Sequence, residues 1–281
     1  MREPLELSTE EMRQFRSLIY DLAGISIPTT KVTMLSNRIR KRLRAGGYED
    51  YAQYLEFLKQ DQNREEREEF LNAITTNETF FFRTPTHFDW ITSNFVPEFA
   101  ALVRKEQHPS RLKLWSAACS SGEEPYSIAI TLLENQFRLR GINAEVTGTD
   151  LSERVLSMAR EGHYGERSMN TVSDKRRRRY FQYEKQRDRW TVTDAVKTLV
   201  KFEHHNLLEP SPRTDFDCIF IRNVLIYFDR VSKRKTLRHL TDALRPGGYL
   251  IVGPSEGVFD LLGDYKRITP FCYQKPPASP S

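Results

Sequence analysis

The segment from Leu112 to Tyr126 constrains what this chain can fold into more than any other part of the sequence. An apolar run ends there in six small residues, which are followed by a glycine, two acids and a proline. This order is typical of a buried strand that turns tightly into a helix, because proline is favoured in the first helical turn. Small side chains in such a turn let a ligand approach the backbone. The segment therefore predicts either an ordinary strand–helix turn or a ligand-binding turn.

The polar residues of this turn indicate what kind of ligand would fit. Ala118, Ser120 and Gly122 stand at the alternate positions that glycines occupy in the G-x-G-x-G loop of dinucleotide-binding proteins. Glu123 and Glu124 follow at the start of the expected helix. Carboxylates at this place would repel a phosphate, so the turn favours a ligand that carries a cationic amine.

The composition predicts one large domain or two unequal ones. Of the 281 residues, 38% are hydrophobic, which is enough for a sizeable core. The net charge of +5 is mild, so local clusters of charge matter more than the total. Three scattered cysteines form neither a disulfide framework nor a metal-binding pair, which favours the reducing cytosol. Without a membrane-length apolar run or a signal-peptide pattern, the sequence predicts a cytoplasmic protein that does not insert into a membrane.

Residues 1–77 are expected to form a small all-helical N-terminal domain. Ser8 and Glu11 form a capping-box pattern at the start of the first helix, and Gly24 ends that helix. Three further helices are expected at about 30–45, after Asp50, and at about 64–75. No strand pattern separates them, so a bundle is predicted.

The second of these helices is strongly basic. Its cations are Arg38, Arg40, Lys41, Arg42 and Arg44. Like charges at this density cost helix stability, so they form either a solvated face or a docking surface for an acidic partner. Readout of bases would bring aromatic, Asn or Gln side chains among the cations, and only Ile39 and Leu43 lie between them. The pattern therefore favours an acidic protein helix over nucleic acid.

Residues 78–275 alternate strands with helices, which predicts an α/β sheet with ligands at the carboxyl ends of its strands. Strands are expected at 112–117, 144–149, 200–205, 217–222 and 249–253, with a last strand or pair within 265–273. Residues 189–193 and 197–200 alternate like a short hairpin, so an inserted β-subdomain is expected near 183–200. Residues 276–281 are expected to be a disordered tail.

Polar residues follow several of these strands where the strands end. Asp150 closes the second strand, and asparagines at 206 and 223 follow the third and fourth. A carboxylate at the end of the second strand can accept both ribose hydroxyls, although Asp150 could also only cap the next helix. An adenosine with an amino-acid moiety would use an acid for the ribose, an amide for the adenine and an acid for the ammonium group. Together the residues predict a nucleoside site.

Four segments resemble the CheR family, the chemotaxis receptor methyltransferases. They are Thr75–Arg83, Trp115–Ala129, Arg222–Phe228, and Leu244–Leu250 together with Ser255-Glu256. The resemblance implies a Rossmann-like class I methyltransferase sheet with a helical N-terminal domain and an inserted β-subdomain. It implies transfer of a methyl group from S-adenosylmethionine to receptor glutamates, which gives γ-methyl esters and S-adenosylhomocysteine. The expected partner is the cytoplasmic helical signalling region of transmembrane chemoreceptors.

Carried over residue by residue, the family pattern implies a set of cofactor contacts. They are Asn77, Thr79, Arg83, Glu123 or Glu124, Asp150, Asn206, Leu207, Asn223 and Val224. Of the paired acids, Glu123 is preferred. The resemblance also points to Arg83 and Tyr227 as neighbours of the reacting methyl group.

The chemistry needs few catalytic groups. The sulfonium activates the methyl group, and a glutamate with a pKa of about 4.3 is already ionised at neutral pH. The displacement therefore needs no general base, and catalysis reduces largely to positioning and desolvation. Arg83 could hold one oxygen of the target carboxylate while the other attacks, or could form only a structural salt bridge. Tyr227 could orient the carboxylate or pack against the methyl group.

The resemblance also implies which partners the protein binds. Acidic receptor helices would dock on the basic helix. Family members that tether a receptor pentapeptide carry a glycine-containing insertion in the β-subdomain, and 183–200 contains no glycine, so pentapeptide independence is expected.

An adenine-amino methyltransferase would carry prolines after Asn223, where Val-Leu-Ile-Tyr stands, so nucleic acid is not an expected substrate. A non-enzymatic sensor would tolerate loss of Arg83 or Tyr227. The six histidines are dispersed, and no metal is expected.

Overall fold

A computed structural model describes residues 7–60, 62–75 and 78–278. The chain divides into two compact units. One unit comprises Met1–Thr76 with Tyr227–Lys235, and the other comprises Asn77–Ile226 with Thr236–Ser281. Within the described residues, no helix has both the length and the apolar character needed to cross a membrane.

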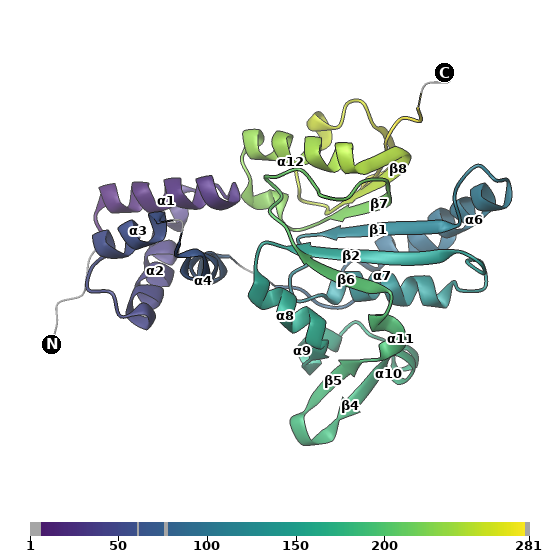
Figure 1. Cartoon of the computed structure of the whole chain (residues 1–281), viewed down its shortest axis with the longest axis horizontal. Helices are drawn as coiled ribbons and strands as arrows, with labels where there is room; N and C mark the ends of the chain where they lie inside the picture. Colours follow the sequence, from purple (N-terminus) through teal and green to yellow (C-terminus); the bar gives the residue numbers. More distant parts are fainter. Residues whose placement is uncertain (1–6, 61, 76–77, 279–281) are drawn as a thin grey trace. The chain divides into compact units, whose positions relative to one another are not determined.

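The first unit contains the four expected helices, which are confirmed (Figure 1). They are α1 (Thr9–Ala23), α2 (Val32–Gly46, after the short turn η1, Thr29–Lys31), α3 (Tyr51–Lys59) and α4 (Arg64–Ile74). The capping box forms as expected, because the Ser8 hydroxyl accepts from the Glu11 N–H and Glu11 accepts from the Ser8 N–H. Gly24 ends α1 in the left-handed conformation at φ 70°.

Aromatic side chains fill the core between these helices. Phe15 of α1 is fully buried, and its ring lies 6.4 Å from that of Tyr51 and 5.9 Å from that of Phe70. The helices therefore bury a common apolar face, which is what their spacing of apolar residues predicts.

The second unit is built on a seven-stranded sheet with the order β6-β2-β1-β7-β8-β10-β9. The strands are β1 (Arg111–Ala117), β2 (Asn143–Asp150), β6 (Val200–His204), β7 (Phe216–Ile221), β8 (Leu244–Val252), β9 (Lys266–Thr269) and β10 (Cys272–Gln274). The first five of these in the sheet order run parallel, and β10 is antiparallel to both β8 and β9. Strand order reverses beside β1, so the carboxyl ends of β1, β2 and β7 meet at a topological switch point. The predicted α/β sheet is confirmed.

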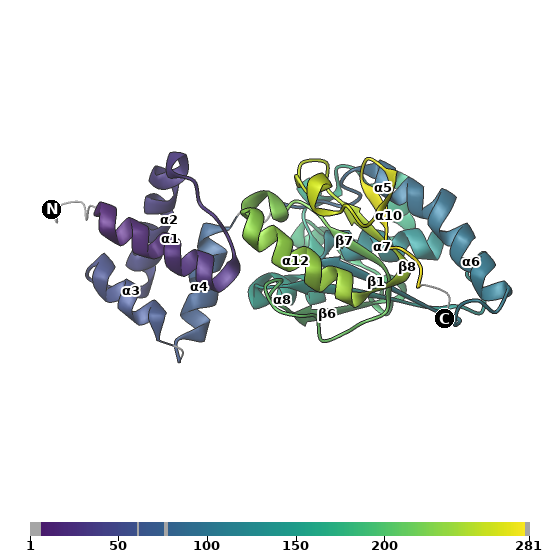
Figure 2. The ribbon, with the colours of Figure 1, turned by 90° about the horizontal axis from the view of Figure 1, so that it is seen from above.

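Helices cover the sheet on both faces, with α7 against one and α12 against the other (Figure 2). The helices are α5 (Pro85–Trp90), α6 (Val96–Arg104), α7 (Glu123–Glu134), α8 (Glu153–Glu161), α9 (Glu166–Met169), α10 (Asp174–Tyr180), α11 (Asp194–Lys197) and α12 (Arg230–Ala243). A turn of π-helix, η2 (Ile91–Phe95), joins α5 to α6, so the helical segment from Pro85 to Arg104 is continuous. Short 3-10 turns occur at η3 (Lys185–Arg187), η4 (Leu225–Tyr227) and η5 (Phe259–Leu261).

The β-subdomain forms, but not with the expected strands. Its sheet has the order β3-β5-β4, from β3 (His163–Tyr164), β4 (Phe181–Glu184) and β5 (Arg189–Val192). The expected pairing of 189–193 with 197–200 is wrong, because Lys197 ends α11 and Val200 begins β6. The alternation in 197–200 arises because the end of α11 is followed closely by the start of β6. The fully buried Val196 belongs to α11.

His87 of α5 gives the second unit a sensitivity to acid. Its side chain is 1% exposed and stacks on Phe271 with 4.2 Å between ring centres. Burial, with a smaller contribution from the charge of Arg222, lowers the pKa of His87 from 6.5 to about 3. Between these two values the unfolded chain binds a proton that the folded protein does not, so stability falls as the pH falls below 6.5.

We expect His87→Phe to reduce this acid sensitivity, because phenylalanine keeps the stacking and cannot bind a proton. Between pH 7 and pH 5 the wild type should lose about 2 kcal/mol more unfolding free energy than the variant. Urea unfolding of both proteins at the two pH values measures the difference. Equal losses would show that His87 does not set the acid sensitivity.

Candidate active site

The turn after β1 adopts a glycine-like backbone without a full set of glycines. Ala118, Ser120 and Gly122 have φ values of 61°, 51° and 93°, all in the left-handed region. These are the three alternate positions that the sequence pattern singled out. A Cβ at Gly122 would lie 2.7 Å from the Cβ of Ala159, so the third position also requires glycine for space.

This turn is held against the end of β2. The N–H of Cys119 donates to the Thr149 carbonyl at 2.8 Å, and the N–H of Ser120 donates to Asp150 Oδ2 at 2.8 Å. Asp150 Oδ1 accepts from the N–H of Ser152 at 3.0 Å. Burial raises the pKa of the Asp150 carboxyl, and these backbone donors oppose the rise.

Asp150 is not the cap of the following helix. Ser152 is the N-cap of α8, because its hydroxyl accepts from the N–H of Val155 at 3.2 Å. Asp150 accepts from the backbone N–H groups of Ser120, Ser152 and Leu151, whereas a carboxylate offers about four acceptor positions. The carboxylate therefore retains capacity for one hydroxyl donor of a ribose.

The two acids of the turn face different surroundings. Glu123 is 2% exposed and accepts from the hydroxyls of Ser121 at 2.8 Å and Ser168 at 3.0 Å. Burial raises the pKa of Glu123. Glu124 accepts from the Ser116 hydroxyl at 2.7 Å and forms an ion pair with Arg222 at 2.7 Å.

Arg222 links the turn to the segment that contains Arg83. One of its nitrogens, Nη1, donates to Glu124, and the other, Nη2, donates to the Arg83 carbonyl at 2.6 Å and to Thr84 Oγ1 at 2.9 Å. The Arg83 guanidinium lies 5.7 Å from the ring centre of Phe80 and donates to the Glu78 carbonyl at 2.9 Å. No sequence signal assigned a role to Arg222, although it stands directly before the predicted Asn223.

The loop after β7 is held by the buried carboxylate of Glu256, for which the sequence alone predicted no role. Glu256 is 1% exposed and accepts from the N–H groups of Asn223 and Ile226. Asn223 is left-handed at φ 60°. The signals available in the sequence were its place shortly after a buried strand and the family-like Ser255-Glu256 pair, and its partners are backbone groups that no sequence pattern reveals.

Asn206 and Leu207 lie beside Asp150, because the N–H of His205 donates to the Asp150 carbonyl at 3.0 Å. The structure thus brings the Arg83, Glu124, Asp150, Asn206 and Asn223 segments to neighbouring strand ends. Thr79 and Val224 are half-buried in the same unit. Asn77 lies outside the described residues. Tyr227 belongs to the unit of the N-terminal helices, where its carbonyl accepts from the Ser26 N–H at 2.8 Å.

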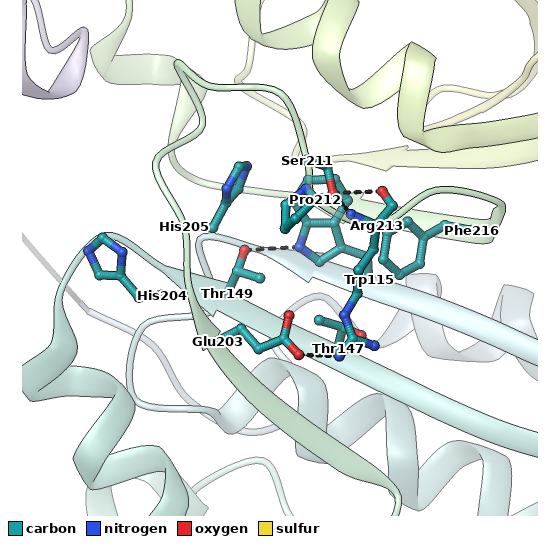
Figure 3. Close-up of a pocket in the computed structure, with 10 residues that line it drawn as sticks. All are labelled: Trp115, Thr147, Thr149, Glu203, His204, His205, Ser211, Pro212, Arg213 and Phe216. Carbon is teal, nitrogen blue, oxygen red and sulfur yellow. Dashed lines mark hydrogen bonds and ion pairs between the residues drawn. The ribbon is translucent and has the colours of Figure 1, made fainter.

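A separate shallow pocket lies beside β1, β2 and β6, and its lining includes His204 and His205 at the carboxyl end of β6 (Figure 3). Trp115 donates to the Thr149 hydroxyl at its base, and Glu203 pairs with Arg213 at its side. Its lining residues are not among the predicted cofactor contacts.

The basic helix α2 uses part of its charge internally. Arg38 donates to the carbonyls of Ile74 and Thr75, and Arg42 forms an ion pair with Glu66 at 2.5 Å. Lys41 and Arg44 are exposed one helical turn apart on one face. Arg40 is half-buried, and its Nε lies 3.3 Å from the Tyr51 hydroxyl.

The fold and site define a class. The strand order, the left-handed turn after β1 and the carboxylate at the end of β2 are those of a class I S-adenosylmethionine-dependent methyltransferase. Residues 77–270 match the family model for the SAM-binding domain of CheR methyltransferases, and residues 10–75 match the model for their all-alpha domain. The chain belongs to the CheR methyltransferase family, as the sequence motifs predicted.

Relatives cover nearly the whole chain. A chemotaxis protein methyltransferase of Salmonella typhimurium is 38% identical over 278 residues, covering 94% of this chain and 90% of the relative. A probable chemotaxis protein methyltransferase of Rhizobium etli is 36% identical, covering 88% and 94%. One from Vibrio parahaemolyticus is 35% identical, covering 94% and 95%.

We expect Gly122→Ala to weaken binding of S-adenosylhomocysteine at least about tenfold and to cost about 2 kcal/mol of stability, because the added Cβ meets Ala159. Gly141→Ala is the matched control, since Gly141 is also left-handed at φ 79° but has nothing within 4 Å of an added Cβ. Titration calorimetry and urea unfolding measure the two effects. Equal losses in both variants would show that backbone strain, and not the contact with Ala159, is responsible.

Proposed function

We propose that this protein transfers the methyl group of S-adenosylmethionine to glutamate side chains of chemoreceptors, forming γ-methyl esters and S-adenosylhomocysteine. One observation carries the proposal. The segments that contain Arg83, Glu124 and Asn223 meet at one edge of the sheet, and Arg222 links them through its hydrogen bonds. The names of the relatives, which are chemotaxis protein methyltransferases, support chemoreceptors as the substrate. The site of action in this proposal is the cytoplasmic signalling region of the receptor.

The residues at the strand ends fit the cofactor. The turn at Gly122 leaves no room for a side chain, and Asp150 keeps acceptor capacity for a ribose hydroxyl. Asn206-Leu207 and Asn223-Val224 would surround the adenine. Asn77 and Thr79 complete the proposed set of contacts.

Glu123 is our preferred partner for the ammonium group of the cofactor. Within the described residues it has no ion pair, whereas the charge of Glu124 is balanced by Arg222. An ammonium group beside Glu123 would supply the missing positive charge and favour the ionised form of the carboxyl that burial disfavours.

Catalysis by this chain consists of positioning. When bound, the cofactor supplies a methyl group that its sulfonium has already activated. Arg83 holds the receptor carboxylate by one oxygen and leaves the other free to attack, without a pairing so strong that it quenches the nucleophile. Tyr227 orients the same carboxylate or packs against the methyl group. Because the target glutamate is ionised at neutral pH, the step needs no general base.

The proposal is tested by incubating the protein with tritiated S-adenosylmethionine and membranes that contain chemoreceptors. Base-labile label on the receptor band is the expected result. Label in added RNA, or no label at all, would reject the function.

We expect Arg83→Ala to lower kcat for receptor methylation about 100-fold, because one oxygen of the target loses its positive partner. Rates at saturating receptor and cofactor measure the effect. Arg167→Ala is the control, since Arg167 is an exposed arginine that pairs with Glu78 in the same unit. Full activity of Arg83→Ala would leave Arg83 with a structural role only.

The exposed cations of α2 form the proposed docking face for an acidic receptor helix. All five cations of the helix were candidates, but Arg38 and Arg42 hold the helical domain together, so reversing them would confound docking with unfolding. Lys41 and Arg44, with Arg40 at the edge, remain available.

We expect the double variant Lys41→Glu, Arg44→Glu to raise KM for the receptor about tenfold, more at low salt than at high salt, while binding of S-adenosylhomocysteine stays unchanged. Lys59→Glu on α3 is the control for a charge change elsewhere on the domain. An unchanged KM in the double variant would remove α2 from the docking face.

The proposal includes independence from a receptor pentapeptide. The hairpin of β4 and β5 closes through η3 and Asp188, which is left-handed at φ 47°. It contains no glycine, so it lacks the feature that the resemblance associates with tethering.

A further inference from the structure

Arg222 is buried at the centre of the site and has no role in the proposed chemistry. It follows β7 directly, and its side chain is 2% exposed. Its three hydrogen bonds go to Glu124, to the Arg83 carbonyl and to the Thr84 hydroxyl. Two of these hydrogen bonds therefore hold the backbone of Arg83, the residue proposed to bind the substrate, and the side chain of its neighbour Thr84.

The segment that Arg222 holds has an unfavourable backbone on both sides of Arg83. Phe82 and Thr84 have φ values of 52° and 63°. A bulky or β-branched residue rarely adopts this conformation, and it persists only where the surroundings hold it in place. Ser127 holds one side by accepting from the Phe82 N–H at 2.9 Å, and Arg222 holds the other.

The contacts require an arginine and not merely a positive charge. A guanidinium presents its donors in a rigid plane, so Nη1 can pair with Glu124 while Nη2 donates to two acceptors. A lysine ammonium could keep the ion pair but would not reproduce the planar geometry. Because Glu124 balances the charge, the arginine can remain buried at this place.

We propose that Arg222 is a positioning residue for methyl transfer, which fixes the backbone from which the Arg83 side chain projects. The inference rests on the proposed function, because Arg83 matters here as the group that holds the target carboxylate. In this scheme Arg222 affects the rate through the 82–84 segment, while its ion pair with Glu124 holds the turn after β1.

The decisive experiment compares Arg222→Lys in two backgrounds. In the wild type, Arg222→Lys should lower kcat about tenfold to a hundredfold, with the dissociation constant of S-adenosylhomocysteine changed less than about threefold. In the Arg83→Ala background the same substitution should lower the residual rate by less than about twofold, because the side chain that it positions is gone. If Arg222→Lys lowered the rate by the same factor in the Arg83→Ala background as in the wild type, the proposal would be overturned.

Two further variants keep the test independent of folding. Thr84→Val removes the hydroxyl that Nη2 binds while keeping the side-chain shape, so it should lower kcat in the same direction with a smaller effect. Arg213→Lys is the matched control, since Arg213 also bridges protein acceptors in this unit, at Glu145 and Glu203. Arg213→Lys should have wild-type kcat. If Arg222→Lys does not fold, a full rate in Thr84→Val overturns the proposal.

Hydrogen exchange gives a readout that does not depend on activity. Amides of peptides covering 80–86 should exchange faster in Arg222→Lys and Thr84→Val than in the wild type and in Arg213→Lys. Unchanged exchange would show that Arg222 does not hold this segment. If the wild type transfers no methyl group to receptors, the proposed function fails, whereas the exchange result still decides whether Arg222 holds the backbone.

Discussion

The ion pair between Arg222 and Glu124 joins two segments that are 98 residues apart in the chain, and the arrangement of the site depends on it. Burying both charges costs desolvation, which good geometry and additional hydrogen bonds can offset. Ser116, Arg83 and Thr84 supply those hydrogen bonds. The pair also separates the roles of the two acids, since it neutralises Glu124 and leaves Glu123 for a ligand cation.

Unfavourable backbone conformations cluster around this ion pair. Left-handed residues other than glycine occur in the turn after β1, on both sides of Arg83 and at the start of the loop after β7. Each such residue costs about 1–3 kcal/mol in isolation, so the fold must hold them through its hydrogen bonds. Backbone donors to Asp150 and Glu256 hold two of these loops. These hydrogen bonds are made by the chain itself, without a ligand, which suits a reaction that depends on positioning.

Most of the fold could be predicted because its signals are local. The capping box at Ser8, the glycines that end α1 and α2, and the apolar strand before Ser116 each determine structure within a few residues. The hairpin partner of β5 could not be predicted, because strand pairing is set by contacts across the sheet and 197–200 alternates like a strand by coincidence. The internal use of Arg38 and Arg42 was also hidden, since a run of cations does not show which of them meet carbonyls or Glu66.

For the same reason, the strand ends that meet at the site were predictable and the contacts that orient them were not. Parallel strands bring their carboxyl ends together whatever the side chains do, so Asp150, Asn206 and Asn223 could be grouped from spacing alone. The links from the β-subdomain to the turn after β1 arise only from packing. Tyr164 donates to the Ser121 carbonyl at 2.7 Å, and Ser168 donates to Glu123 while its carbonyl accepts from the Phe81 N–H. The inserted segment therefore supports Glu123, the turn before it and the approach to Arg83, which makes it part of the wall of the site.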